Sequence, residues 1–406
     1  MHKLKQHKLR VGVGALALFF ASIVLVTRPE SDPFERAAVS DPPFTPLTYG
    51  IQTFLWWDGG QVGLHLDWVR LMNFSHVKQV FAWRDIQPER ERWDFAAADA
   101  VVDQVASKGL RLVARLTHTP EWAISGIAME ARVDVLDTPP DDLKDMAIFC
   151  AAIASRYRGR IAAYQIWNEP NLRREWGGRP PNAAEFADLL KSCSEAIRAA
   201  DPEAILISPG LAPTGQYDDN AHRDDMYLQA LYDAGFEQSI DVVGVHAPGF
   251  TPPEYGPDDA ERDGKGRWAT FRRVEDLRKI MIKNGDAARQ MAILEVGWTT
   301  DQVDPDYAWY AVSEEEQARY LVQAYEYAAE NWRPWIGLMS AIYIAAPTWT
   351  PDNEQYWWAI TTPDNLVRPA FIDLANMAKY CGARVIPARA PDSPEAQGLV
   401  TTRPCD

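Results

Sequence analysis

The feature that most constrains the fold is a regular alternation of short apolar runs with longer segments whose apolar residues recur at helical spacing. The strand candidates lie at residues 48–55, 77–83, 111–117, 162–167, 204–208, 241–246, 291–296 and 337–344. Short strands that alternate with helices form parallel βαβ units, and eight such units are what a closed barrel requires. We therefore predict the α/β fold class and a (β/α)₈ TIM barrel.

Helices are predicted between these strands. The candidates lie at residues 95–108, 141–157, 183–200, 270–284 and 313–331, and a last helix at 369–380 closes the ring. The alternative is an open, doubly wound sheet, which needs a Gly-x-Gly-x-x-Gly turn directly after a strand. The two Gly-x-Gly pairs, at 12–14 and 264–266, lie in an apolar N-terminal stretch and in a charged loop. Neither pair has the required context, so the barrel is favoured.

One large domain with short flanking segments accounts for the chain. Residues 1–10 are basic and residues 11–26 carry no charge, a pattern typical of a signal peptide or a membrane anchor. The apolar run is slightly short for a spanning helix, but no convincing cleavage site follows it, so we favour an anchor that leaves the basic tail in the cytoplasm and exports the rest. Residues 27–46 are rich in Pro, Asp and Ser, as expected of a linker. Residues 47–382 hold the barrel and residues 383–406 form a tail.

Charge limits the partners of this domain. The formal net charge is −16, although residues 1–30 carry five basic side chains and one acidic one, so the rest of the chain is more acidic than the total suggests. An acidic domain repels nucleic-acid phosphates. We expect no nucleic-acid partner, a membrane contact only through the N-terminal segment, and a monomer.

The four cysteines fit an exported protein without requiring export. Cys150 and Cys193 fall in two consecutive predicted helices, whereas Cys381 and Cys405 bracket the C-terminal tail. Among the three possible pairings we favour 150 with 193 and 381 with 405. Four inert thiols are the alternative.

The most informative motif ends the fourth predicted strand, where an apolar run leads into Asn168-Glu169-Pro170-Asn171. Pro170 cannot continue the strand, so Asn168 and Glu169 stand at its C-terminal end, the active face of a barrel. Burial beside Trp167 and Pro170 is expected to raise the pKa of Glu169 toward that of a general acid. A Glu that caps the next helix is the alternative.

A second glutamate interrupts the seventh apolar strand. Glu295 lies between Leu294 and Val296, and an acid there is costly to bury unless it is paired or functional. A core Glu paired with a basic neighbour is the alternative. Because strands four and seven form opposite walls of one barrel mouth, the two carboxyls can stand about 5 Å apart, the separation used to form a covalent glycosyl-enzyme.

These motifs resemble clan A of the retaining glycoside hydrolases, also called the 4/7 superfamily. WRDIQPE at 83–89, followed by WDF at 93–95, is similar to the strand-two region of families 39 and 5, and LTHTPEWA at 116–123 resembles their strand-three ending. The resemblance covers roughly residues 48–380, and family 39 is favoured ahead of family 5. It implies retaining hydrolysis of O-glycosidic bonds in an oligo- or polysaccharide, with no cofactor.

The resemblance also implies roles for single residues. Glu169 resembles the acid/base and Glu295 the nucleophile. Asn168 is similar to the residue that binds the sugar 2-hydroxyl, and His246 to the residue beside the nucleophile, with a structural His as the alternative. In strand two, Lys78 stands where an Arg is usual, and Lys cannot reproduce a bidentate guanidinium contact.

Further substrate contacts are expected from side chains at strand ends. Tyr343 or Trp349 must serve in place of the Trp that usually ends strand eight. The chain has sixteen Trp residues, and aromatic faces suit sugar rings, although we expect about half of those at strand ends to be packing. An aromatic cleft favours internal cutting. The remaining expected contacts are Trp83, His118, Trp122 and Trp298.

Three alternative functions use the same fold. A metal-dependent hydrolase needs clustered ligands, whereas the seven His residues are scattered without His-x-His or His-Glu-x-x-His spacing, so we expect no metal. A catalytically inactive carbohydrate-binding barrel is disfavoured because both glutamates are present. A transglycosylase uses the same residues and stays open.

Overall fold

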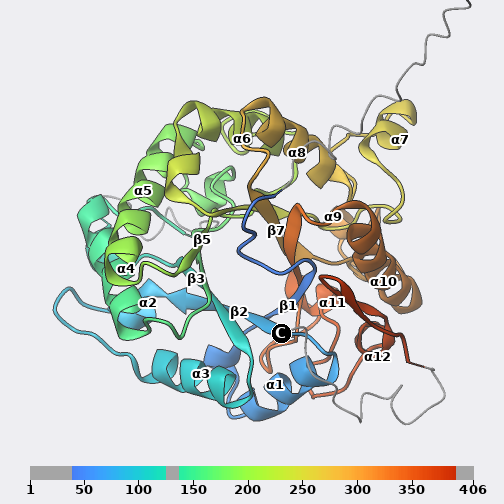
Figure 1. Ribbon diagram of the computed structural model, residues 1–406, viewed down its shortest axis with the longest axis horizontal. Helices are drawn as coiled ribbons and strands as arrows, with labels where there is room; N and C mark the ends of the chain where they lie inside the picture. Colours follow the sequence, from blue (N-terminus) through green and yellow to red (C-terminus); the bar gives the residue numbers. More distant parts are fainter. Residues whose placement is uncertain (1–38, 125–136, 390–406) are drawn as a thin grey trace, which may run out of the picture.

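The computed structural model describes residues 39–124 and 137–389. In this part of the chain eight parallel strands pair in sequence order and close into a barrel, with β1 beside β8. The predicted (β/α)₈ barrel is therefore confirmed, and Figure 1 shows the helices in a ring around the strands. The strands are β1 (Thr48–Thr53), β2 (His76–Ala82), β3 (Arg111–Thr117), β4 (Ala163–Ile166), β5 (Ile205–Ile207), β6 (Val242–His246), β7 (Gln290–Val296) and β8 (Ile336–Ala341).

Long helices cover the outside of the barrel, and short helices lie in its loops. The long helices are α1 (Val62–Leu71), α3 (Ala96–Ser107), α4 (Leu143–Arg156), α5 (Ala183–Ala200), α6 (Asp224–Asp233), α8 (Arg273–Lys283), α10 (Glu314–Asn331) and α12 (Pro369–Asn376). Four short helices lie in loops after strand ends: α2 (Trp83–Ile86), α7 (Pro257–Arg262), α9 (Pro305–Ala308) and α11 (Glu354–Trp358). Polar side chains cap the N-termini of several helices. At the start of α5, the Asn182 side chain accepts hydrogen bonds from two backbone N–H groups.

The barrel interior is closed at its N-terminal end by Phe44, which the sequence assigned to the linker. Phe44 is 3% exposed and packs in one cluster with barrel-lining side chains such as Val113 and Val242. Its backbone N–H and carbonyl both bond the side-chain amide of Gln290, at 3.0 Å each. Phe44, within the predicted linker at residues 27–46, therefore packs against the floor of the barrel.

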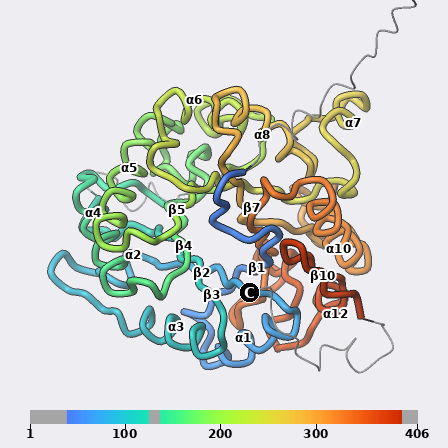
Figure 2. Tube along the Cα trace, viewed as in Figure 1, coloured from blue at the N-terminus to red at the C-terminus, as the bar shows by residue number. Residues whose placement is uncertain are grey.

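The C-terminal end of the fold also differs from its prediction. Helix α12 stops at Asn376 rather than at 380, and β9 (Lys379–Cys381) then pairs antiparallel with β10 (Arg384–Ile386). This hairpin lies beside α12 (Figure 2). Buried Lys379 donates to the carbonyls of Leu374 and Met377, which satisfies acceptors left open by the helix end. The barrel domain thus runs past residue 382.

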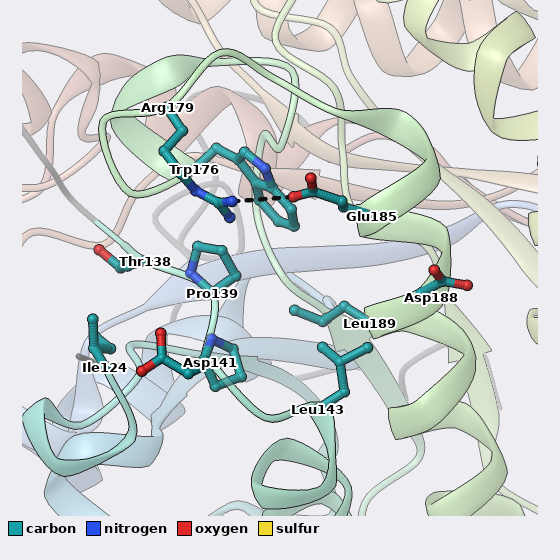
Figure 3. Close-up of a pocket in the computed structure, with 11 residues that line it drawn as sticks. Ile124, Thr138, Pro139, Asp141, Leu143, Trp176, Arg179, Glu185, Asp188 and Leu189 are labelled. Atoms are coloured by element: carbon teal, nitrogen blue, oxygen red, sulfur yellow. Dashed lines mark hydrogen bonds and ion pairs between the residues drawn. The ribbon is translucent and has the colours of Figure 1, made fainter. Parts of the chain in front are cut away.

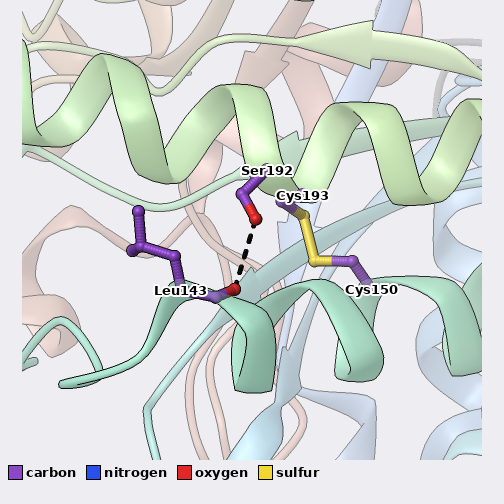
Figure 4. The surroundings of a disulfide bond; sticks show 4 residues. All are labelled: Leu143, Cys150, Ser192 and Cys193. Carbon is purple, nitrogen blue, oxygen red and sulfur yellow. Dashed lines mark hydrogen bonds between the residues drawn. A yellow bond between two sulfur atoms is a disulfide. The ribbon is translucent and has the colours of Figure 1, made fainter.

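A disulfide joins two neighbouring helices of the ring. Cys150 on α4 and Cys193 on α5 are bonded, with 5.5 Å between their Cα atoms, and Figure 4 shows the bridge between the two helices. This predicted pair is confirmed. The other predicted pair includes Cys405, and the predicted anchor spans residues 11–26; both lie outside the described residues. Within residues 39–124 and 137–389, no helix combines the length and apolarity needed to cross a membrane.

Candidate active site

The turn after β4 presents Glu169 at the barrel mouth. Trp167 and Glu169 both adopt positive φ angles, 71° and 39°, a conformation that costs energy for such residues and often marks functional sites. The turn is held because the fully buried Trp167 indole donates to the carbonyl of Glu175 at 2.9 Å. The backbone N–H of Glu169 donates to the carbonyl of Gly210 at 3.1 Å.

His246 reaches the site from the end of β6. The pairing of β6 with β7 shifts register between Val245 and His246, which brings His246 opposite Glu295. A bulge of this kind re-aims a side chain. Gly210 leaves room for the imidazole, because a Cβ at that position would collide with the His246 ring. Sequence reasoning did not single out Gly210, since only the packed structure shows this approach.

The two glutamates face each other across His246. His246 Nδ1 lies 2.9 Å from Glu169 Oε1, and its Nε2 lies 3.7 Å from Glu295 Oε1. One carboxylate oxygen of each Glu and one His246 nitrogen all lie within 4.8 Å of one another. Retaining glycosidases hold their two carboxyls about 5–5.5 Å apart. The structure therefore brings together the two residues that the sequence paired.

Two buried cations surround Glu295. Lys78 Nζ on β2 lies 3.2 Å from Glu295 Oε1, and Arg115 Nη1 on β3 lies 3.4 Å from the same oxygen. Burial raises the pKa of Glu295, but the charges of His246, Lys78 and Arg115 together outweigh it and hold that pKa well below its usual range. Glu295 is thus ionised at neutral pH. The sequence-based expectation missed Arg115, although an Arg inside the otherwise apolar run LVARL at 112–116 was a signal of the same kind as Glu295.

Asn168 is held by hydrogen bonds to two neighbouring side chains. Its Oδ1 accepts from Arg115 Nη1 at 3.0 Å, and its Nδ2 donates to Glu175 Oε1 at 3.5 Å. This orientation leaves the amide beside Glu295, because Arg115 contacts both. The structure therefore places Asn168 in one hydrogen-bonded group with Arg115 and Glu295.

The surroundings of Glu169 contradict one expectation. Burial is the largest influence on its pKa and raises it, as predicted, but the hydrogen bond and charge of His246 and the charge of Arg174 outweigh burial and lower it. Arg174 Nη2 lies 3.5 Å from Glu169 Oε2. The predicted raised pKa is wrong because these two neighbours come from the β4 loop and from β6, and the motif alone shows neither contact.

The same three side chains also have the geometry of a cation site. Glu169, His246 and Glu295 each offer one ligand atom within 4.8 Å of the others. Lys78 and Arg115, however, already supply positive charge at Glu295. A cation at this position would be repelled by both, so the arrangement suits paired carboxyl chemistry better than metal binding.

Aromatic side chains from the β8 end lie near the pair. Tyr343 is partly exposed and packs against Phe54 and Trp349, with ring centroids 5.7 and 5.6 Å away. Burial, then the negative charges of Glu295 and Glu354, raise the pKa of Tyr343. Tyr343 is therefore near Glu295, and Trp349 packs beside Tyr343.

Three of the expected sugar-binding Trp residues are used for packing instead. Trp83 and Trp298 are fully buried, and their indole N–H groups donate to Gln87 and to the carbonyl of Thr251. Trp122 is partly exposed, but Arg90 covers its ring at 4.5 Å and its N–H is also bonded. The sequence could not predict this, because the alternation of polar and apolar residues does not show which face of a Trp ring is covered by neighbouring side chains.

His118 lies beside the group around Glu169 and Glu295 rather than within it. It lines a cavity of about 300 Å³ together with Arg84, Asp137 and the catalytic-site residues Arg115 and Asn168. Its φ of 64° places it in the left-handed region directly after β3. The cavity therefore adjoins the site described above.

Comparison with known proteins adds a family. The family model described as cellulase (glycosyl hydrolase family 5) matches residues 48–287. No curated protein matches the chain in sequence. Family 5 is the second of the two families favoured from the sequence, whereas family 39 is represented among the solved structures with the same fold.

Three of those structures show the same barrel at low identity. A family 39 glycoside hydrolase from Bacteroides cellulosilyticus WH2 is 17% identical over 86% of this chain and 64% of its own, with a TM-score of 0.58. The family 39 enzyme of Xanthomonas axonopodis pv. citri is 16% identical over 84% and 67%, with a TM-score of 0.59. A family 5, subfamily 18 protein of Streptomyces cattleya is 18% identical over 81% and 79%, with a TM-score of 0.58.

The extent of these matches decides what they establish. The chain covers less than two thirds of the length of the Bacteroides structure, and at such identities the structures establish the fold alone. The family model, in contrast, spans more than half of the chain, from β1 to beyond α8. The chain therefore belongs to the cellulase family, glycosyl hydrolase family 5, and so to the clan A that its two glutamates indicated.

Proposed function

We propose that the protein hydrolyses O-glycosidic bonds of an oligo- or polysaccharide with retention of anomeric configuration. The observation that supports this is the separation of Glu169 and Glu295, whose nearest ligand oxygens lie within 4.8 Å. A carboxyl pair this close leaves no room for the water that an inverting enzyme places between its carboxyls and the sugar.

In the first step Glu295 acts as nucleophile. Its ionised carboxylate attacks the anomeric carbon while the bond from that carbon to the leaving oxygen breaks, and Glu169 gives its proton to that oxygen. In the second step Glu169 removes a proton from water, the water oxygen bonds the anomeric carbon, and the bond to Glu295 breaks. Configuration inverts twice and is retained.

The neighbouring side chains prepare both carboxyls. Lys78 and Arg115 keep Glu295 ionised. Their N–H donors are already oriented toward Glu295 before charge develops in the transition state. Asn168, held by Arg115 at 3.0 Å, is placed to bind the sugar 2-hydroxyl, a contact that strengthens in the transition state. His246 bonds Glu169 through Nδ1 at 2.9 Å, and its Nε2 lies 3.7 Å from Glu295 Oε1.

Removal of each glutamate tests these roles. Glu169→Ala is expected to lower turnover roughly 10²- to 10⁴-fold, the usual contribution of a general acid, and Glu295→Ala should lower it further. Azide should rescue Glu295→Ala on an activated aryl glycoside to give a glycosyl azide of inverted configuration. With Glu169→Ala, azide should give the retained product, because the nucleophile is intact.

A matched control and two outcomes separate the alternatives. Glu315→Ala removes an exposed carboxyl from α10 and should leave turnover unchanged. Near wild-type activity in Glu295→Ala would refute the assignment. Release of reducing ends identifies hydrolysis, whereas rearranged oligosaccharides without new reducing ends would identify a transglycosylase.

A further inference from the structure

A second feature of the catalytic face is the cavity of about 300 Å³ beside Asn168. Its lining includes Arg84, Arg115, Thr117, Asp137, Asn168 and Glu175. Arg115 and Asn168 belong both to this cavity and to the site around Glu295. A sugar bound at the catalytic pair therefore has one side next to these charged groups.

Arg84 brings an uncommitted guanidinium to this cavity. Among the described residues the only carboxylate within 4 Å of it is that of Asp85, which Arg84 Nε approaches at 3.9 Å. The backbone N–H of Arg84 donates to the carbonyl of His118 at 2.8 Å, which ties its backbone to the loop after β3. Both terminal nitrogens of Arg84 thus remain available for a ligand.

Neither carboxyl of the cavity forms an ion pair with Arg84 within 4 Å, although the charge of Arg84 lowers the pKa of Asp137. Asp137 accepts backbone N–H groups of His118, Thr119 and Thr138 at 2.6, 3.1 and 2.8 Å, so those dipoles already compensate its charge. Burial, with the charges of Glu169 and Asp137, raises the pKa of Glu175 to about 8. Glu175 therefore holds a proton at neutral pH and behaves as a neutral hydrogen-bonding group.

Buried donors in the same wall lack acceptors. The Thr117 hydroxyl is buried at the end of β3 and bonds no other described residue, and the same holds for Arg115 Nε. Thr117 is only 3% exposed. A buried polar group without a partner costs about 1–3 kcal/mol, and a ligand that supplies acceptor oxygens would remove that cost.

The other large cavity of the catalytic face provides a contrast. It has a volume of about 410 Å³ and is lined largely by apolar side chains such as Ile124, Leu143 and Leu189. Arg179, the arginine that lines it, is paired with Glu185 at 3.2 Å (Figure 3). An available cation next to unpaired buried donors is thus a property of the cavity beside Asn168.

We propose that this cavity binds the carboxylate of an acidic sugar, so that the enzyme acts on a polysaccharide that contains uronic acid residues. Arg84 matches a planar carboxylate with two parallel N–H groups. The inference rests on the proposed function, because it names the class of sugar that the same site accepts.

Binding measurements test the proposal without requiring turnover. The probes are oligomers of glucuronate, galacturonate, mannuronate and guluronate, each against the same oligomer with its carboxyls reduced to alcohols. The members of each pair differ in charge and keep the same ring hydroxyls. At least one acidic oligomer should bind wild-type protein about 10-fold or more tightly than its reduced partner. The difference should shrink as ionic strength rises.

Variants locate the effect. Arg84→Gln should abolish the difference between acidic and reduced oligomers, whereas Arg92→Gln, an exposed arginine on the same segment that pairs with Glu89, should preserve it. Equal binding of all pairs, or a difference that survives in Arg84→Gln, would overturn the inference. Hydrolysis of neutral polysaccharides alone would also overturn the inference, while the proposed function would stand. Specific binding of acidic oligomers without any turnover would overturn the proposed function, while the binding of acidic sugars would stand.

Discussion

Glu169 and Glu295 lie within one barrel mouth, yet their neighbours differ in kind. Glu295 faces two nearly buried cations, Lys78 and Arg115, on adjacent strands. Glu169 faces His246 and a half-exposed Arg174 from its own loop. In the proposed mechanism this positive charge keeps the free Glu295 carboxylate ionised before it attacks, whereas Glu169 must take up and release a proton. The partially solvated contact with Arg174 suits a group whose charge changes.

Arg174 should therefore tune the pH dependence of the reaction. Its charge lowers the pKa of Glu169, as do the contacts with His246, while Glu295 raises it. The first chemical step needs protonated Glu169, so kcat/KM should fall as pH rises through that pKa. Arg174→Gln removes a lowering influence and should move this falling limb to higher pH, which a pH profile of kcat/KM measures.

The neighbouring loop offers a control for this effect. Arg179→Gln removes a guanidinium that pairs with Glu185 instead of Glu169, and its profile should match that of the wild type. If both variants lose activity and the falling limb of their kcat/KM profiles does not move, Arg174 has only a structural role.

At the scale of elements, the short segment before β1 completes the barrel. Phe44 packs with side chains that line the barrel interior, and its backbone bonds Gln290 at the start of β7. The proposed catalytic residues lie at the opposite strand ends, after β4 and on β6 and β7. Stability and catalysis are therefore carried by different ends of the same strands, as is usual for this architecture.

Phe44→Ala should expose this separation. Loss of a buried Phe typically lowers the free energy of unfolding by about 3–5 kcal/mol. The midpoint of thermal or urea unfolding should fall clearly, while kcat/KM at 25 °C changes little. Phe44→Leu keeps most of the buried volume and should lose much less stability. A variant that loses activity but keeps its unfolding midpoint would contradict this assignment.

The sequence predicted elements well where the pattern was long and local. All eight strands and helices such as α5 appear within a few residues of their expected bounds, because apolar periodicity records which face is buried. The hairpin of β9 and β10 was missed because each strand has three residues. Strands that short carry too little pattern, and the hairpin is held by long-range hydrogen bonds to Pro46, Leu47 and Tyr49.

At the scale of the whole molecule, buried ionisable groups link stability to pH. Burial, with Glu169 and Asp137, raises the pKa of Glu175 from 4.5 to about 8 in the folded state. Between those values the folded state holds the proton more tightly than the unfolded state does. Stability that this group contributes at low pH is therefore lost as pH rises from about 4.5 to about 8.

Glu175→Gln should remove this dependence. The variant keeps a neutral side chain at all pH values, so its stability relative to wild type should rise between pH 5 and pH 9, by roughly 5 kcal/mol at most. Unfolding midpoints of both proteins at these two pH values measure the change. A stability difference that is the same at both would show that Glu175 does not carry a raised pKa.

The sequence by itself determined the barrel, the strand ends on which chemistry occurs and the two glutamates, because strand periodicity and an acid in an apolar run are local signals. Only the tertiary structure decided which charges meet those glutamates. Arg115, Arg174 and Gly210 belong to three different segments, and their contacts with Glu295, Glu169 and His246 arise from strand register and loop packing. The tertiary structure also corrected the expected pKa of Glu169 and the expected roles of the buried Trp residues. Electrostatic and steric effects depend on distances in space, which spacing along the chain does not record.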